Sequence, residues 1–132
     1  MKFLNPRIHG YLDYVVVAAL LLAPSIFGFS GAPAILCYVL AVAQFGMSIL
    51  TAYPLGAVKL IPFTLHGGVE LATAVLLLVS PWLFGFSDVP AARNFFLASA
   101  VVLGAVWAVT DYKAAQLPSA TGGMRIPTRR HV

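Results

Sequence analysis

The 132-residue sequence has few charged side chains: 8 Lys and Arg and 4 Asp and Glu, together 9% of the chain. Soluble domains carry about 25% charged and about 45–50% apolar residues, whereas apolar residues make up 61% of this chain. A soluble globule of this size cannot bury so much apolar surface, but lipid accepts it. The composition therefore excludes an ordinary soluble domain and predicts an integral membrane protein that has the lipid bilayer as a partner.

Cysteine is nearly absent as well. The single Cys37 lies in an apolar run, which excludes a disulfide framework and a redox pair. The formal net charge of +4 comes from the termini and one loop. Because these basic residues form no stripe along a helix, no nucleic-acid partner is expected. The sequence also has no Gly-rich phosphate loop and no nucleophile motif.

Two copies of one pattern fill most of the chain. They coincide when the sequence is shifted by 57 residues, and the match fades after Ala41 and Ala98. Identities at a fixed offset in polar, aromatic, Pro and Gly positions predict a tandem repeat, with copies over about residues 7–53 and 62–112. The matches include His9-Gly10 with His66-Gly67, Asp13 with Glu70, Pro24 with Pro81, and Phe27-Gly28-Phe29-Ser30 with Phe84-Gly85-Phe86-Ser87.

Each copy holds two apolar runs that are long enough to cross about 30 Å of hydrocarbon as helices. Asn5, Ser30 and Ser87 are expected to cap three of these helices at their N-termini. The predicted fold class is all-α: an integral membrane four-helix bundle made of two tandem helical-hairpin repeats, occupying residues 1–112. A basic tail over residues 113–132 is expected to be disordered. The four helices are expected from about Pro6 to Ala23, Pro33 to Thr51, Pro62 to Ser80 and Pro90 to Tyr112.

Basic residues near the ends of the helices predict the orientation of the chain. The side that holds both termini and the loop over residues 52–61 carries nearly all of them, whereas the side of the two hairpin turns carries only Arg93. We therefore expect a multi-pass protein of the cell membrane, the inner membrane in a bacterium, with both termini cytoplasmic. The basic residues of the cytoplasmic side are Lys2, Arg7, Lys59, Lys113, Arg125, Arg129 and Arg130.

The segment Ser80-Pro81-Trp82, followed by Leu83-Phe84-Gly85-Phe86-Ser87, resembles the motif of the SPW repeat family. The first copy has Ala23-Pro24-Ser25 in place of this triplet but keeps the proline and the Phe-Gly-Phe-Ser tail. The resemblance covers roughly residues 7–112. It implies a small multi-pass membrane protein of bacterial or archaeal type, in which the motif closes the first helix of a two-helix repeat. It implies no activity and no catalytic residue.

The ionisable residues of the expected helices gather near one end. His9 and Asp13 are four residues apart and share a helix face, and His66 and Glu70 repeat this arrangement. The repeat therefore predicts a polar layer near the cytoplasmic ends of all four helices. The ends of the second and fourth helices bring further polar residues to that depth: Thr51, Tyr53, Thr110, Asp111 and Tyr112.

Three functions are open for this layer. In the first, the protein is structural or partner-binding and has no cofactor. The polar layer then fixes the register of the helices, either within one chain, in a homo-oligomer or in a complex with another membrane protein. In the second, it is a metal-binding or redox membrane enzyme, whose divalent metal is held by His9, Asp13, His66 and Glu70. In the third, it is a small transporter or channel subunit, although Gln44 is nearly alone as a polar step in the middle of the helices. A separation of His9 from His66 above about 12 Å would exclude a shared metal.

Overall fold

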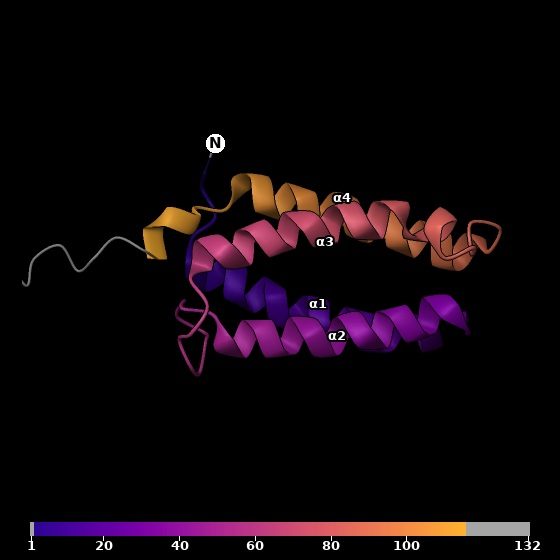
Figure 1. The fold of residues 1–132 in the computed structure, drawn as a ribbon, viewed down its shortest axis with the longest axis horizontal. Coiled ribbons are helices and arrows are strands. Elements are labelled where there is room, and N and C mark those ends of the chain that lie inside the picture. Colours follow the sequence, from indigo (N-terminus) through magenta and orange to yellow (C-terminus); the bar gives the residue numbers. More distant parts are fainter. Residues whose placement is uncertain (1, 116–132) are drawn as a thin grey trace, which may run out of the picture.

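The computed structural model describes residues 2–115. Among these residues it has no strand beyond isolated bridges, and the predicted all-α bundle of two helical hairpins is confirmed (Figure 1). The predicted disorder of the tail concerns mainly residues 116–132, which lie outside the described residues. The elements are α1 (Pro6–Phe27), α2 (Ala32–Leu50), α3 (Phe63–Leu83), α4 (Pro90–Val109) and the short 3-10 helix η1 (Tyr112–Ala115).

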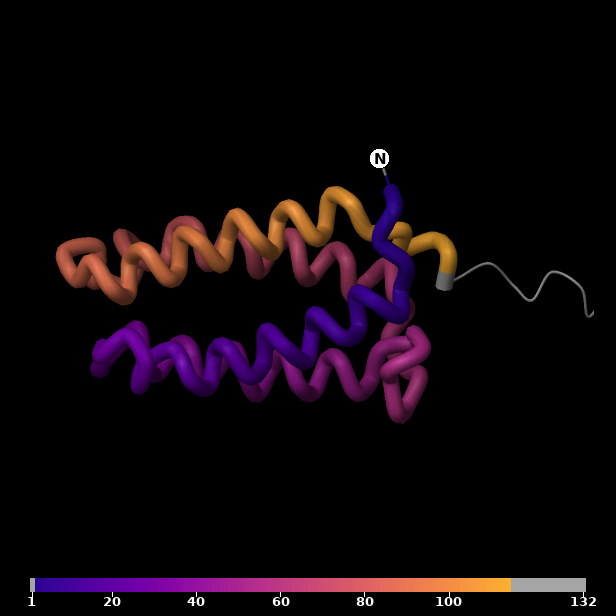
Figure 2. Tube along the Cα trace, turned by 180° about the vertical axis from the view of Figure 1, so that it is seen from behind, coloured from indigo at the N-terminus to yellow at the C-terminus, as the bar shows by residue number. Residues whose placement is uncertain are grey.

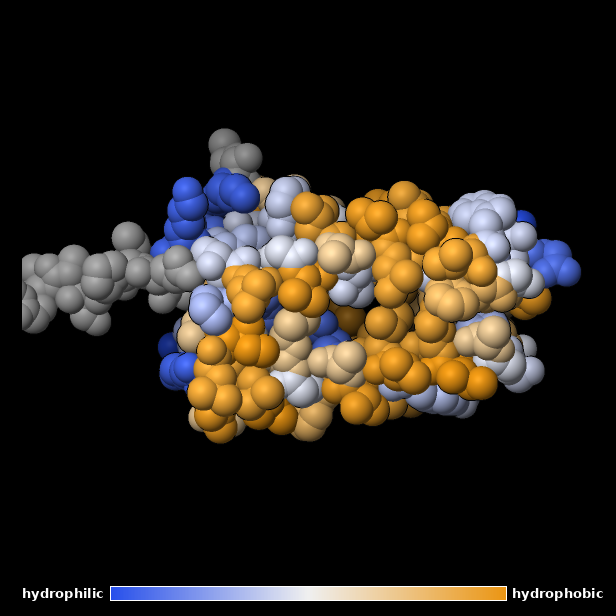
Figure 3. Space-filling model, viewed as in Figure 1, coloured by the Kyte–Doolittle hydropathy of each residue, from blue (hydrophilic) through white to orange (hydrophobic). Residues whose placement is uncertain are grey.

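All four helices are long and apolar enough to cross a membrane, with 19 to 22 residues and mean hydropathy between 1.6 and 1.9. Their outer faces carry large apolar side chains such as Leu22, Val42 and Val101, which are more than half exposed. Figure 3 shows these apolar surfaces covering the middle of the molecule, with hydrophilic residues gathered at its two ends. This distribution is the one that a lipid bilayer requires, because the polar ends then meet water and the middle meets hydrocarbon.

The helices form two layers, each of which is one hairpin. α1 packs along α2 and α3 packs along α4, while α1 and α4 are in contact between the hairpins (Figures 1 and 2). The start of the described chain, the loop between the hairpins and η1 all lie at the same end of the bundle. We call this end the rim; it comprises residues 2–5, 51–62 and 110–115.

The first helix of each hairpin is longer than predicted. The expected ends at Ala23 and Ser80 are wrong, because α1 and α3 continue for about one turn beyond, through Pro24 and Pro81. Proline lacks an N–H but keeps its carbonyl, which here accepts a hydrogen bond from the N–H five residues on, at 3.1 Å in the first hairpin and 2.8 Å in the second. These bonds close the helix ends, and the chain then turns away through a glycine.

The Phe-Gly-Phe-Ser tail of the motif has a structural explanation. Gly28 and Gly85 have φ angles of 69° and 74°, in the left-handed region where side chains are disfavoured. The phenylalanines that follow, Phe29 and Phe86, are 5% and 3% exposed and turn into the core between the hairpins. The motif therefore reverses the chain and anchors the turn at the same time.

Of the three predicted N-caps, one is confirmed and two are wrong. Asn5 is the N-cap of α1, as predicted, and its side chain accepts the backbone N–H three residues on at 2.9 Å. Ser30 and Ser87 are not caps. The N-cap residues of α2 and α4 are Gly31 and Val89, and neither makes a side-chain capping bond. These helix starts place a proline in the first turn, where its missing N–H needs no partner.

Two short backbone pairings hold the rim together and explain why α4 ends at Val109 and not at Tyr112. Leu4, before α1, pairs with Thr110, after α4, and Ile61, before α3, pairs with Thr51, after α2. Thr51 and Thr110 have extended backbone conformations with ψ angles of 140° and 135°, so the helices stop there. Each pairing brings the end of one hairpin to the start of the other.

Candidate functional site

The four ionisable residues singled out by the repeat lie together between the two hairpins at the rim. His9 and Asp13 extend from α1, and His66 and Glu70 extend from α3. All are buried, with exposures of 0%, 2%, 0% and 3%. The imidazole rings of His9 and His66 have their centroids 5.5 Å apart, well inside the limit for a shared ligand. We call these four residues the His/acid cluster.

Carboxylate oxygens surround the inward nitrogen of each histidine. The Nε2 atom of His9 lies 3.3 Å from Asp13 Oδ1 and 3.3 Å from Glu70 Oε2. The Nε2 atom of His66 lies 3.3 Å from Asp13 Oδ2. Asp13 thus spans both imidazoles through its two oxygens. Because His9–Glu70 and His66–Asp13 are contacts between α1 and α3, the cluster connects the hairpins.

Two threonines from the rim fix the outward nitrogens. Thr110 Oγ1 lies 2.8 Å from His9 Nδ1, and Thr51 Oγ1 lies 2.7 Å from His66 Nδ1. Each hydroxyl donates its single proton to the backbone carbonyl four residues before it, at 2.6 Å in both cases. The threonine oxygens can therefore only accept from the imidazoles, so each histidine carries its proton on Nδ1 and directs Nε2 toward the carboxylates.

Two tyrosines donate to the carboxylates. The hydroxyl of Tyr53 donates to Asp13 Oδ2 at 3.0 Å, and the hydroxyl of Tyr112 donates to Glu70 Oε2. Burial, together with the neighbouring carboxylate, raises the pKa of both phenols well above the usual value of 10.0. Both therefore remain neutral donors. They supply the carboxylates with hydrogen bonds but leave the histidine Nε2 atoms without any.

The proton count shows what the cluster lacks. A neutral histidine with its proton on Nδ1 has a lone pair on Nε2, and here each lone pair faces a carboxylate oxygen that also has only lone pairs to offer. Both Nε2 atoms and Glu70 Oε1 are buried without a hydrogen-bond partner. Positive charge between the nitrogens and oxygens is required to make this arrangement favourable. Either additional protons or a metal cation can provide it.

Aromatic rings close the cluster on the side of the rim. Phe63 is fully buried, with its ring centroid 5.1 Å from that of His9, 5.3 Å from Tyr53 and 4.7 Å from Tyr112. The position of Phe63 in the first repeat is occupied by Pro6, so this cover is present in one copy only. Phe63 separates the cluster from water at the rim and lowers the local dielectric constant, which strengthens every charge interaction there.

Glycine at two equivalent positions allows the cover to approach. A Cβ atom on Gly67 would lie 2.9 Å from the ring of Tyr112, and one on Gly10 would lie 2.9 Å from the side chain of Leu55. Both separations are shorter than real Cβ contacts. The glycines that follow the two histidines are thus required for the close packing of rim residues, and not for helix–helix approach.

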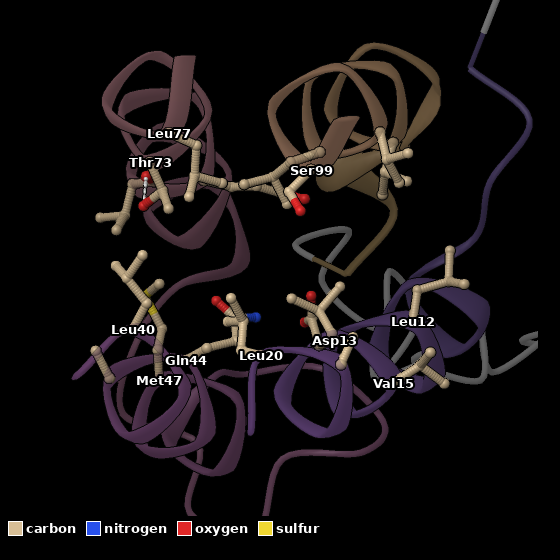
Figure 4. A pocket seen from close by; sticks show the side chains of 18 of the residues that line it. Leu12, Asp13, Val15, Leu20, Leu40, Gln44, Met47, Thr73, Leu77 and Ser99 are labelled. Carbon is tan, nitrogen blue, oxygen red and sulfur yellow. Dashed lines mark hydrogen bonds between the residues drawn. The ribbon is translucent and has the colours of Figure 1, made fainter. Parts of the chain in front are cut away.

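An apolar cavity lies on the other side of the cluster, toward the middle of the helices. Its volume is about 380 Å³, and all four helices line it (Figure 4). Asp13 and Glu70 form part of its wall, whereas His9 and His66 do not. Figure 3 shows the molecule hollowed between the two hairpins. The carboxylates therefore stand between the histidines and an apolar space that is open to the surroundings of the helices.

The sequence shift of 57 residues does not align the threonines and tyrosines of the two copies, so the repeat did not indicate their equivalent roles. Thr51 and Tyr53 correspond to Thr110 and Tyr112 at 59 residues and not at 57. The second hairpin turn is longer by two residues, which shifts the second helices out of the first register. A separate search for recurring Thr-x-Tyr would have found the pair. No similar signal exists for Phe63.

The threonine bonds lead to a matched prediction. Replacing Thr51 or Thr110 with valine leaves a buried imidazole N–H without an acceptor, and each change should lower the free energy of unfolding by about 1–3 kcal/mol. Thr73 makes the same bond to the carbonyl four residues before it, at 2.9 Å, but contacts no histidine. Thr73→Val should therefore change stability by less than about 0.5 kcal/mol. Thermal unfolding in mild detergent measures these changes. An equal loss of stability in all three variants would contradict the prediction.

Comparison with protein families matches a family model described as the SPW repeat domain to residues 7–114. The match covers α1 from its second residue, all of α2, α3 and α4, and the whole His/acid cluster. No curated protein and no solved structure matches the chain.

Proposed function

The chain belongs to the SPW repeat family, and we propose that this multi-pass membrane protein holds one divalent metal ion in the His/acid cluster, where the ion joins the two hairpins. The role is structural. Each hairpin contributes one imidazole and one carboxylate, so an ion at this place cross-links the two repeats. This proposal favours the metal-binding alternative over a cluster without metal, and it keeps the protein outside the class of enzymes.

The observation that carries the proposal is the pair of buried histidine Nε2 atoms that face carboxylate oxygens and have no hydrogen-bond partner. The nitrogen–oxygen distances are 3.3 Å in all three contacts. Ligand atoms at about 2.0–2.1 Å from a tetrahedral zinc ion are separated by about 3.3 Å along the edges of the tetrahedron. The same distance is longer than a typical charged N–H···O bond, which is about 2.7–2.9 Å. The spacing therefore fits a bound ion better than a direct ion pair.

The ligand set fits a borderline metal. Ligand atoms of His9, His66 and Glu70 all lie within 4.8 Å of one another, and Asp13 contacts both histidines. Two imidazoles with two carboxylates suit Zn²⁺, Mn²⁺ or Fe²⁺. The surrounding residues also match the usual support of a metal site, in which each ligating histidine gives its other N–H to a fixed acceptor. Thr51 and Thr110 provide these acceptors.

The charge distribution supports a cytoplasmic location for the site. Lys2, Lys59 and Lys113 belong to the rim, Arg7 lies in the first turn of α1 next to it, and Arg93 lies near the start of α4 at the opposite end. Because basic residues mark the cytoplasmic side, we place the rim and both termini in the cytoplasm and the helices in the cell membrane. The ion would then be taken from the cytoplasm.

Elemental analysis of protein purified without a histidine tag tests the proposal. After loading with zinc, manganese or iron and dialysis, we expect one ion per chain in the unaltered protein and none in His9→Ala or His66→Ala. The third histidine of the chain gives a matched control, and His131→Ala should retain the ion. Helical circular dichroism of each variant separates loss of metal from loss of fold. Folded unaltered protein that holds no stoichiometric metal would overturn the proposal in favour of a cluster of protonated histidines and carboxylates.

A further inference from the structure

We propose that the apolar cavity between the hairpins binds one hydrocarbon chain of a bilayer phospholipid, which enters sideways from the membrane between α2 and α3. The head group stays outside the bundle and is not selected. This inference goes beyond metal binding and does not depend on it, because it concerns the apolar part of the space between the hairpins and not the His/acid cluster.

The cavity lies at the depth of the membrane hydrocarbon. Its lining on α1 extends from Leu12 to Leu20, a distance of about 12 Å at about 1.5 Å per residue. This stretch lies inside a helix that covers Pro6–Phe27 and is long and apolar enough to cross the membrane. Because lipid chains surround a transmembrane helix at this depth, the medium from which the cavity can be filled is hydrocarbon and not water.

The cavity is continuous with the outer surface that faces lipid. Figures 1 and 3 share one view, in which α2 and α3 lie in front, and Figure 3 shows the molecule hollowed between the hairpins on this side. Figure 4 shows Leu40 and Met47 of α2 opposite Thr73 of α3 at one edge of the cavity. Ala43 and Val69, from the same two helices, also line the cavity and are exposed. A lipid chain can therefore enter from the membrane without passing the His/acid cluster.

The size and walls of the cavity suit a hydrocarbon chain. Its volume is about 380 Å³, whereas an apolar cavity of about 150 Å³ is already large enough to bind benzene. Ala19, Ala43 and Ala98 leave room in the walls on three helices, and most of the remaining lining is Leu, Val, Met and Phe. Left empty, a space of this size would deprive the wall atoms of dispersion contacts. A flexible apolar chain restores these contacts.

The polar side chains of the lining select no polar ligand. Asp13 and Glu70 are 2% and 3% exposed, so their carboxylates offer almost no surface to the cavity. The hydroxyl of Thr73 donates to a backbone carbonyl of its own helix at 2.9 Å, as Figure 4 shows, and the amide of Gln44 is directed to a serine on the same helix at 3.4 Å. That leaves Ser99, and a single hydroxyl is too few because a buried water needs about two to four polar partners.

Photolabelling in lipid nanodiscs tests the inference. The probe is a phosphatidylcholine that carries a diazirine halfway along one acyl chain, diluted in unlabelled phosphatidylcholine. We expect fragment mass spectra to place label on Met47 and Leu77, which line the cavity, as well as on Leu22 and Val42, which lie on the outer faces of the helices. Label on the outer residues alone would overturn the proposal.

Two adjacent alanines of α1 give a matched pair of variants. Ala19 lines the cavity, whereas Ala18 is exposed and does not line it. Ala19→Phe should fill the cavity and remove the label from Met47 and Leu77, with the label on the outer faces unchanged, and Ala18→Phe should retain both. Ala98→Phe, on another helix, should repeat the loss. Helical circular dichroism shows which variants are folded, and folded cavity variants that keep the inner label would contradict the proposal.

Water is the other possible occupant, and cysteine accessibility distinguishes it from a lipid chain. The native Cys37 is fully buried, so the cysteine introduced by Ala43→Cys is the one that a charged thiol reagent can report. We expect no modification of this variant in nanodiscs, because a charged reagent does not enter hydrocarbon. Ala57→Cys, at an exposed position of the rim, should be modified completely. Equal modification of the two variants would show a wet cavity and overturn the proposal.

Discussion

Asp13→Ala is expected to lower the free energy of unfolding by about 3–5 kcal/mol, the usual cost of removing one partner from a buried charge pair. Asp13 contacts both histidines at 3.3 Å and accepts from Tyr53. Its removal leaves the Tyr53 phenol without its acceptor and takes one ligand from the metal. Thermal unfolding followed by helical circular dichroism in mild detergent measures the loss, and metal content measured on the same sample should fall to zero.

The control for this change is the other aspartate at the rim end of the helices. Asp111 accepts the backbone N–H of Ala114 at 3.2 Å and does not belong to the His/acid cluster. Asp111→Ala should cost less than about 1 kcal/mol and should leave the metal in place. If the two alanine variants had equal stability, Asp13 would not be the centre of a charged cluster.

Removal of the metal should have an effect of similar size. An ion that binds only the folded chain stabilises it by about 4.1 kcal/mol when its free concentration is a thousandfold above the dissociation constant. A membrane-impermeant chelator that removes the ion from detergent-purified protein should therefore lower the unfolding temperature strongly, and added Zn²⁺ should restore it. His66→Ala should begin at the lower temperature and should respond neither to chelator nor to zinc.

This prediction separates a metal site from a cluster of ion pairs. Ion pairs between imidazolium and carboxylate groups do not depend on a chelator. Folded protein could instead unfold at the same temperature with chelator and with zinc. That result would show that protons and not a metal hold the cluster together.

Much of the fold follows from the sequence because the repeat duplicates both polar and apolar positions. The spacing of His9 to Asp13 and of His66 to Glu70 places each pair on one helix face. The pairing of two similar hairpins then brings the faces together. The helix ends are less well predicted. Proline suggests a stop at Pro24 and Pro81, but the left-handed glycines four residues later are what end the helices.

The sequence predicts the depth of the threonines and tyrosines, and Thr-x-Tyr recurs, but it does not predict which histidine each threonine contacts. Thr110 reaches His9, and Thr51 reaches His66, because backbone pairings at the rim connect the end of one hairpin with the start of the other. The number and length of the predicted helices do not indicate these backbone pairings. The role of Phe63 follows from a single residue that the repeat does not duplicate. The cavity depends on the distance between the hairpins, which composition does not determine.

The arrangement explains why the buried ionisable residues of the described chain gather next to the rim. Each hairpin carries a histidine whose outward nitrogen is held by a threonine of the other hairpin. The inward nitrogens lie near the carboxylates that the two hairpins contribute. Separation of the hairpins would expose all of these groups to hydrocarbon, which is costly. The cluster and its ion would therefore fix how the two repeats sit against one another.

X-ray absorption at the metal edge, on zinc-loaded protein in nanodiscs, tests the central claim most directly because it reports the atoms bound to the ion. The account predicts a first shell of nitrogen and oxygen at about 2.0–2.1 Å with the scattering pattern of two imidazoles. A sulfur shell at about 2.3 Å would place the ion at a cysteine and not in the cluster, and the single Cys37 is fully buried among the core residues between the hairpins. A shell of water oxygens without imidazole would contradict the claim as well.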